Sequence, residues 1–215
     1  MSVHLERATT RNLLDGLRAY ISTFELQLDA AHREDALAIT ESGEHIAHAT
    51  RFSDVLPRLQ HYGFVTLLAL IIEARLSLFW KVAREEYETV PHPEPTPAEF
   101  LERVHSFIIE HLEAEPPEEL WQWIMDIAAV KDCVARYAGS VTSLPEPARR
   151  GLNRIVRHRP GLEISPDDRL HTPLPHASRR VEQVLSIKRD FCLEGVTAAQ
   201  GLFGYLYTHR EPAAR

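Results

Sequence analysis

The segment Trp121–Val141, WQWIMDIAAVKDCVARYAGSV, constrains the fold more than any other part of this 215-residue chain. Its apolar residues recur every three or four positions and cover most of the helix surface, a pattern typical of a helix packed deep among others. Gly139 follows at a position where helices commonly stop. The segment therefore predicts a bundle around a buried central helix. Its polar residues gather just before the stop, at Lys131, Asp132, Arg136 and Tyr137.

These polar residues have two interpretations. Charged groups rarely lie beside a buried segment without an ion-pair partner or a functional role, because their desolvation costs on the order of several kcal/mol. In the alternative interpretation they form an ordinary solvated last turn, in which basic residues are favoured by the helix dipole. Residue type alone leaves both open.

The rest of the chain also favours helices, since it has only nine glycines and long stretches of helical periodicity. We predict helices from Thr9 or Thr10 to about Ala30, from Arg58 to Glu88, from Thr96 to Glu113, from Pro116 to Gly139, from Pro145 or Pro147 to His158, and from Ala177 to Tyr207. A small β-hairpin is predicted near residues 162–171, with strands Leu162–Ile164 and Arg169–His171. The expected fold class is all-α, a helical bundle with one small hairpin.

The chain is long enough for one substantial domain. We expect a single helical domain over residues 1–215, in which residues 1–57 supply an N-terminal helix and a polar connection. The core of the bundle is expected over residues 58–208, and a short tail over 209–215.

Composition excludes several classes of protein. The best apolar run, Phe64–Ile72, is too short to span a membrane before Glu73 interrupts it, so it predicts a core helix. The charged N-terminus lacks an apolar signal core. Cys133 and Cys192 lie in apolar helical settings and are expected to be buried thiols in a reducing cytoplasm. No spacing of histidines and cysteines predicts a metal site, and we expect no cofactor.

Several segments together resemble the HEPN superfamily (higher eukaryotes and prokaryotes nucleotide-binding domains). Members carry an Arg-polar-x3-His sequence at the end of a buried helix, before a turn of small residues. Here Lys131-Asp132-Cys133-Val134-Ala135-Arg136 occupies those slots, and Tyr137-Ala138-Gly139 follows. Upstream, Gly63–Glu86 resembles the family's core helix, with Glu73 in its acidic slot, and residues 148–173 follow the layout of one bacterial branch. The resemblance covers Gly63 to Tyr207 and implies a helical bundle that pairs its motif helices in a dimer.

This sequence departs from the motif in the two residues that matter most. In active members the resemblance implies that the Arg and His form the catalytic pair for metal-independent RNA cleavage. Lys131 could still hold a phosphate, as a point charge without a bidentate fork. Arg136 cannot replace the histidine as a base, because it stays protonated at any relevant pH. The degenerate motif therefore predicts a protein without nuclease activity.

A relocated active site is the alternative. It would combine Lys131 and Glu73 with a histidine from elsewhere, and His158, at the end of the basic helix, is the candidate. The sequence from Arg169 to His176 has the right residue types but contains two prolines, so it is a loop and not a helix end. A surface histidine at a helix end is the plainer interpretation of His158.

Charge is distributed unevenly along the chain. Residues 131–189 contain twelve Lys/Arg and six Asp/Glu, a net charge of +6, whereas the remainder carries −13. Arg150, Arg154 and Arg157 fall on one face of the short basic helix. Together with His158 they are candidates for phosphate contacts, which depend mainly on charge. Alternatively, this stripe pairs with the acidic N-terminal half of the same chain or of a second copy.

The sequence thus favours a non-catalytic HEPN-like protein that binds RNA or a protein partner, as a component of a bacterial stress, toxin–antitoxin or defence system. The alternative is a metal-independent endoribonuclease with a relocated site. Because Trp121, Trp123 and Met125 add large apolar groups to the motif helix, we also expect a symmetric homodimer with Lys131 and Arg136 close to its axis.

Overall fold

The computed structural model describes residues 3–39, 55–87, 99–112, 115–166 and 182–210. In the described part of the chain, the helices are α1 (Val3–Ile39), α3 (Leu56–Tyr87), α4 (Phe100–Leu112), α5 (Glu118–Tyr137), α6 (Glu146–His158) and α7 (Arg189–Arg210), and the strands are β1 (Leu162–Pro166) and β2 (Gln183–Ile187). The fold is all-α with one small antiparallel hairpin, as predicted.

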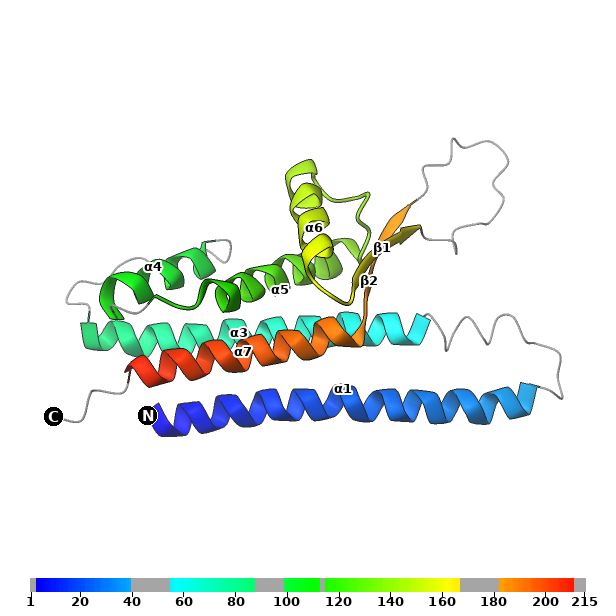
Figure 1. The fold of residues 1–215 in the computed structure, drawn as a ribbon, viewed down its shortest axis with the longest axis horizontal. Helices are drawn as coiled ribbons and strands as arrows, with labels where there is room; N and C mark the ends of the chain where they lie inside the picture. The colour runs from blue at the N-terminus through cyan, green and yellow to red at the C-terminus, as the bar shows by residue number, and fades with distance from the viewer. Residues whose placement is uncertain (1–2, 40–54, 88–98, 113–114, 167–181, 211–215) are drawn as a thin grey trace.

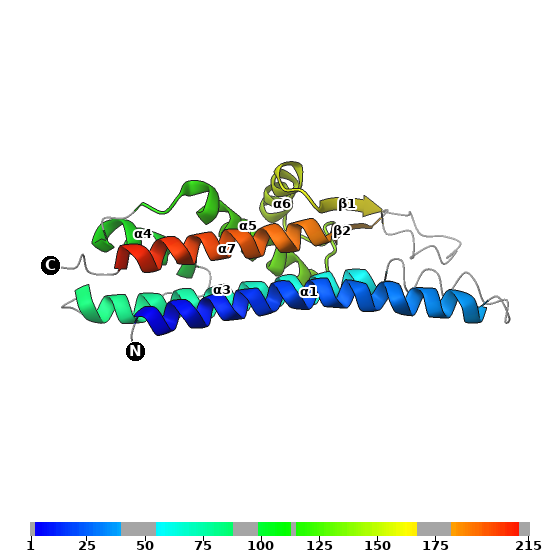
Figure 2. The same cartoon turned by 60° about the horizontal axis from the view of Figure 1, so that its bottom comes forward.

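Three long helices, α1, α3 and α7, lie side by side along the length of the molecule, and Figures 1 and 2 show them from two directions. The motif helix α5 packs on α3 and α7, with α4 against α3 at one end and α6 against α5 at the other. The core is lined by large apolar side chains from α1, α3, α5 and α7, among them Leu14, Phe64, Phe79, Ile124 and Phe203. Burial of this kind is the main source of stability in a bundle of helices.

The first helix is longer than predicted at both ends. Thr10 does not cap it: the Thr10 hydroxyl donates to the Glu6 carbonyl oxygen at 2.9 Å, one turn earlier in the same helix. Its Oγ1 also lies 3.0 Å from the Tyr207 hydroxyl and accepts a hydrogen bond from Arg75 at 2.7 Å. Thr10 is buried, and its partners lie on α3 and α7. It therefore holds α1 against its neighbours from a position within the helix, although its residue type had predicted an N-cap.

A buried ion pair joins the first and last helices beside this threonine. Arg210 Nη1 lies 3.2 Å from Glu6 Oε2, and both side chains are almost completely excluded from water. A buried pair of this kind is costly to break, since removal of either member leaves an unmatched charge in a low dielectric. It fixes the end of α7 against the start of α1.

Helices α3, α5 and α6 lie close to their predicted ranges. Pro117 precedes α5, and Pro145 precedes α6 with Pro147 in its first turn, as the proline positions predicted. Helix α4 begins at Phe100, later than the predicted Thr96, which lies outside the described residues. By length and composition alone, Leu56–Glu85 could cross a membrane, but α3 packs against α1, α5 and α7, as the core helix of a soluble protein does.

The second strand of the hairpin is not the one predicted. Strand β1 pairs along its whole length with β2, from Leu162 opposite Ile187 to Pro166 opposite Gln183. The predicted partner Arg169–His171 lies outside the described residues. Val184, Leu185 and Ile187 are buried, so β2 anchors the hairpin in the core. The last helix consequently begins at Arg189 and not near Ala177, because residues 183–187 are extended.

Candidate functional site

The motif helix ends in a tight turn held by the hairpin. Ala138 and Gly139 both have positive φ, 49° and 81°, and the Gly139 N–H donates to the Cys133 carbonyl oxygen at 3.2 Å. The Leu185 N–H in turn donates to the Gly139 carbonyl oxygen at 2.9 Å. A side chain at position 139 would overlap the Tyr62 hydroxyl, which itself donates to the Leu185 carbonyl. Only glycine fits here, and the stop predicted at Gly139 is confirmed.

Lys131 lies against α3. Its Nζ is 2.7 Å from Glu73 Oε1 and 3.6 Å from Asp132 Oδ1. The two side chains of the closer pair are only 20% and 33% exposed, so their attraction is less screened than at an open surface. The structure thus brings together the first motif slot and the acidic slot of the core helix, and it leaves the Lys131 ammonium largely neutralised.

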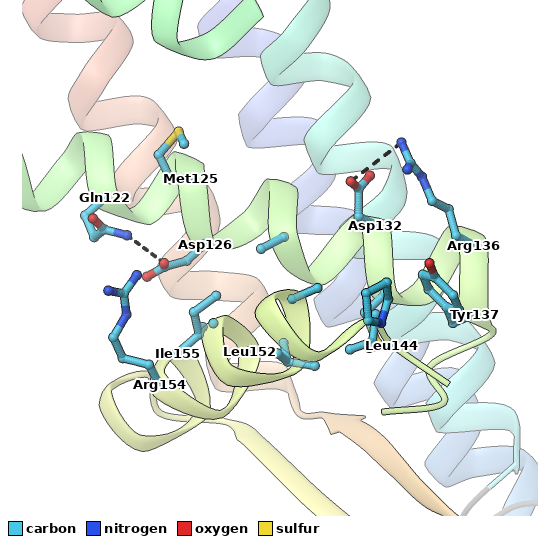
Figure 3. A pocket seen from close by; sticks show the side chains of 15 residues that line it. Gln122, Met125, Asp126, Asp132, Arg136, Tyr137, Leu144, Leu152, Arg154 and Ile155 are labelled. Atoms are coloured by element: carbon cyan, nitrogen blue, oxygen red, sulfur yellow. Dashed lines mark hydrogen bonds and ion pairs between the residues drawn. The ribbon is translucent and has the colours of Figure 1, made fainter. Parts of the chain in front are cut away.

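Arg136 and Tyr137 lie with Asp132 at one end of a groove of about 490 Å³ between α5 and α6 (Figure 3). The Arg136 side chain is 69% exposed and its guanidinium reaches Asp132 only loosely, at 3.8 Å. Arg154, from α6, lies at the other end of the groove, near Gln122 and Asp126. Two arginines that are distant in sequence therefore rim one groove.

The floor between these arginines is mainly apolar. It is formed by Met125, Ala129, Leu144, Ala148, Leu152 and Ile155. A second groove, of about 560 Å³, lies on the other side of α5 against α3 and α4, and it includes Lys131 and Glu73. Four residues line both grooves, and they mark the open face of α5: Met125, Ala129, Asp132 and Arg136.

The predicted basic stripe on α6 is exposed along its length. Arg150 lies 3.7 Å from Glu146 in a pair open to solvent. Arg154 and Arg157 form no ion pair with any residue that the structure describes. They do not meet acidic residues from the described part of the N-terminal half, so that alternative finds no support among the described residues.

His158 does not take the place of the missing motif histidine. Its Nδ1 lies 2.8 Å from the Arg154 carbonyl oxygen within α6, and the ring is exposed at the helix end. Neither groove is lined by a histidine from the described residues. The Cys133 thiol at the floor is also unsuited to nucleophilic chemistry, because burial raises its pKa to about 11 and keeps it protonated.

Sequence reasoning missed the anchor that holds α6 against α5. The buried Asp126 carboxylate lies 2.7 Å from Arg159 Nε and accepts a hydrogen bond from Gln122 at 2.8 Å. The Arg159 guanidinium also covers the ring of Trp123, at 4.1 Å from its centroid. A lone aspartate within the apolar run WIMDIAAV was the available signal, because a carboxylate there requires a cation.

The interpretation of Trp121 and Trp123 as spare surface was wrong. They are only 8% and 6% exposed and pack inside this chain, Trp121 on His105 and Trp123 on Phe191. The apolar excess that motivated a dimer through the motif helix is therefore absent, although this does not test dimerisation itself.

Within the described residues, no group of three or more His, Cys, Asp or Glu side chains is arranged to hold a metal ion. Comparisons with protein-family models, curated proteins and solved structures found no match for this chain. The resemblance to the HEPN superfamily therefore stays a prediction that rests on the residues quoted above.

Proposed function

We propose that this chain is a non-catalytic, HEPN-like RNA-binding protein whose ligand lies in the groove between α5 and α6. The observation that carries the proposal is the position of Arg136 and Arg154 at opposite ends of an apolar floor. Single-stranded RNA offers phosphates for the two guanidinium groups and nucleobases for the apolar floor. Proteins that bind single strands combine a basic groove with aromatic rings on which bases stack, and Tyr137 supplies one such ring here.

The acidic groups nearby permit this ligand. Asp126 is neutralised by Arg159, so its charge is not presented to a phosphate. Asp132 is shared between Lys131 and Arg136 at 3.6 and 3.8 Å, distances long enough for a phosphate to displace it. Arg157 extends the cationic surface along α6 beyond the groove.

The relocated nuclease is the second candidate, and the closeness of Lys131 to Glu73 is the observation in its favour. It lacks the histidine that the resemblance implies for proton transfer, because Arg136 occupies that slot and no described histidine lines either groove. Binding without cleavage is thus the better-supported function. A role in a bacterial stress or defence system, as the resemblance implies, is part of the same proposal.

Fluorescence anisotropy with a labelled single-stranded RNA of about 12 nucleotides, a length that covers one site of this type, tests the proposal. We expect saturable binding at low salt and a loss of at least about tenfold in affinity for Arg136→Glu/Arg154→Glu, because two phosphate contacts are reversed. The matched control is Arg11→Glu/Lys81→Glu, which makes the same change in net charge at exposed positions on α1 and α3.

Equal losses in both double mutants would show that net charge alone governs binding, and would contradict the groove. If the wild-type protein binds no RNA at low salt, the RNA proposal is refuted. A protein partner is then the remaining kind of ligand.

A further inference from the structure

One face of α3 is exposed and apolar, and none of the described helices and strands covers it. Between residues 59 and 77, all exposed side chains of this helix are uncharged: Leu59, Gly63, Leu67, Leu70, Ala74 and Ser77. The three leucines are 61%, 45% and 52% exposed. Their spacing of three or four residues places all six on one side of the helix, over five turns. Isolated exposed leucines are ordinary, but a continuous uncharged stripe of this length marks a contact surface.

Helix α1 widens this face. It runs antiparallel to α3, because Arg75 bonds to Thr10 near one end and His61 lies 3.6 Å from Glu25 near the other. Between those points Leu13 and Tyr20 are 43% and 49% exposed. Both lie on the side of α1 away from Arg18, which bonds to α7, and so they adjoin the outer edge of α3.

We propose that this face is where two copies of the chain meet, with α3 packed antiparallel on its counterpart across a two-fold axis. The residue order of the stripe fits its own reverse. In that arrangement Leu67 faces Leu70, Gly63 faces Ala74, and Leu59 faces Ser77, so each large side chain at the ends meets a small one. A self-complementary patch is what a two-fold interface requires.

The glycine at position 63 indicates that a second helix, and not a lipid surface, covers this face. Apart from the backbone of its own helix, a Cβ at this position would meet no described atom within 4 Å, so no described contact requires glycine there. Glycine weakens a helix interior but lets another helix approach closely. A membrane-facing surface would gain from a larger apolar side chain at the same place.

The size of the face is sufficient for association. The stripe is about 27 Å long and, with α1, about 20 Å wide, so two copies would bury roughly 1,100 Å². Specific interfaces begin at about 1,000 Å². None of the six α3 residues lines the groove between α5 and α6. The inference therefore stands apart from the proposed RNA site.

Sedimentation velocity of the full chain at several micromolar concentrations tests the proposal. We expect wild type at twice the 24.5 kDa chain mass, and Leu70→Glu as a monomer with an unchanged circular dichroism spectrum. Gly63→Leu adds bulk to open surface without adding charge, and it should weaken the dimer at least tenfold. Ala129→Glu, on the open face of α5, is the matched control and should remain dimeric.

Other outcomes overturn the proposal. A wild type that stays monomeric at about 100 µM excludes the interface, because mass action favours a dimer as the protomer concentration rises. A dimer lost in Ala129→Glu but kept in Leu70→Glu places it on α5. Binding to neutral phosphatidylcholine vesicles that Gly63→Leu strengthens and Leu70→Glu abolishes identifies the face as a membrane contact. RNA anisotropy on wild type and Leu70→Glu, which leaves the groove between α5 and α6 unaltered, separates these results from failure of the groove.

Discussion

Lys131 Nζ lies 2.7 Å from Glu73 Oε1, so a carboxylate from α3 already holds the cation in the first slot of the motif. The other motif slot holds Arg136, and an arginine side chain does not act as a general base. The two slots that the resemblance assigns to the catalytic pair thus hold a lysine paired with a carboxylate and an exposed arginine. This arrangement favours the proposed binding role, since no described histidine lines either groove to act as the general acid or base.

We therefore expect no cleavage of labelled RNA by the pure protein in the presence of EDTA. Lys131→Ala and His158→Ala should give the same background as wild type, measured on denaturing gels over several hours. Cleavage that disappears in Lys131→Ala would refute the non-catalytic interpretation. Cleavage that disappears instead in His158→Ala would support a relocated site.

Reversal of the α6 stripe should abolish RNA binding without unfolding the protein. In Arg150→Glu/Arg154→Glu/Arg157→Glu only the exposed pair with Glu146 is lost among described contacts, and such pairs contribute about 0–1 kcal/mol. Thermal unfolding should therefore stay within a few degrees of wild type while RNA retention on a filter is lost. Binding by wild type should weaken steeply with added salt, because neutralised phosphates release counterions.

A fall in thermal stability with no RNA binding by wild type would instead mean that the stripe pairs with acidic residues. If the triple mutant matched wild type in both measurements, the stripe would be plain solvated surface.

Removal of the Asp132 charge should strengthen RNA binding. This carboxylate lies between Lys131 and Arg136 at one end of the groove, where it competes with a phosphate for the same cations. Asp132→Asn is expected to tighten binding by about two- to tenfold at low salt, a range set by one removed charge repulsion in high dielectric. Anisotropy titrations would measure it, with Asp15→Asn on α1 as the control. Weaker binding in Asp132→Asn would contradict a phosphate at this end.

Gly139→Ala should destabilise the fold severely. Its φ of 81° disfavours any side chain, and the new methyl group would overlap the Tyr62 hydroxyl. We expect a loss of at least about 2 kcal/mol in the free energy of unfolding, from urea titrations. Gly16→Ala is the control, since its added carbon meets no described atom within 4 Å and should be neutral or stabilising by roughly 0.5 kcal/mol. Equal stabilities would show that the turn is not as rigid as described.

Stability should fall as pH drops through the mid-6 range, and His61 should contribute to that fall. Burial lowers its pKa in the folded state, although Glu25 at 3.6 Å opposes the shift. The unfolded chain therefore takes up the proton first, so the stabilisation present above about pH 6.5 is lost as the pH falls toward the folded pKa. Urea unfolding at pH 7.5 and 5.5 should show a smaller pH dependence in His61→Gln. An unchanged dependence would exclude this histidine.

The helical part of the fold could be predicted because its signals are local. Prolines at 117 and 145 mark the starts of α5 and α6, and apolar periodicity marks α3 over nearly its whole length. The hairpin was harder, since β1 pairs with a strand that begins after a connection of sixteen residues. The apolar pattern of residues 183–187 is so short that it also fits the start of α7. Only the strand that pairs with these residues distinguishes a strand from a helix here.

The site was predictable in residue type but not in arrangement. Lys131, Asp132 and Arg136 were found from the motif, and Arg154 from its charge, but no local rule places Arg136 and Arg154 on one groove. That groove depends on how α6 crosses α5, which the Asp126–Arg159 pair determines across 33 positions of sequence. Trp121 and Trp123 were misjudged for the same reason, because burial depends on neighbours that sequence does not display.

The Glu6–Arg210 pair imposes an order on how the chain can reach its final form during synthesis. Helix α1 is made before its main packing partner α7, and four other described helices lie between them in the sequence. Until then Leu14, Leu17 and Ile21 lack the surface that covers them, and Glu6 lacks its arginine. The bundle therefore closes only when α7 is complete, and a contact so distant in sequence slows folding and exposes nascent chains to aggregation.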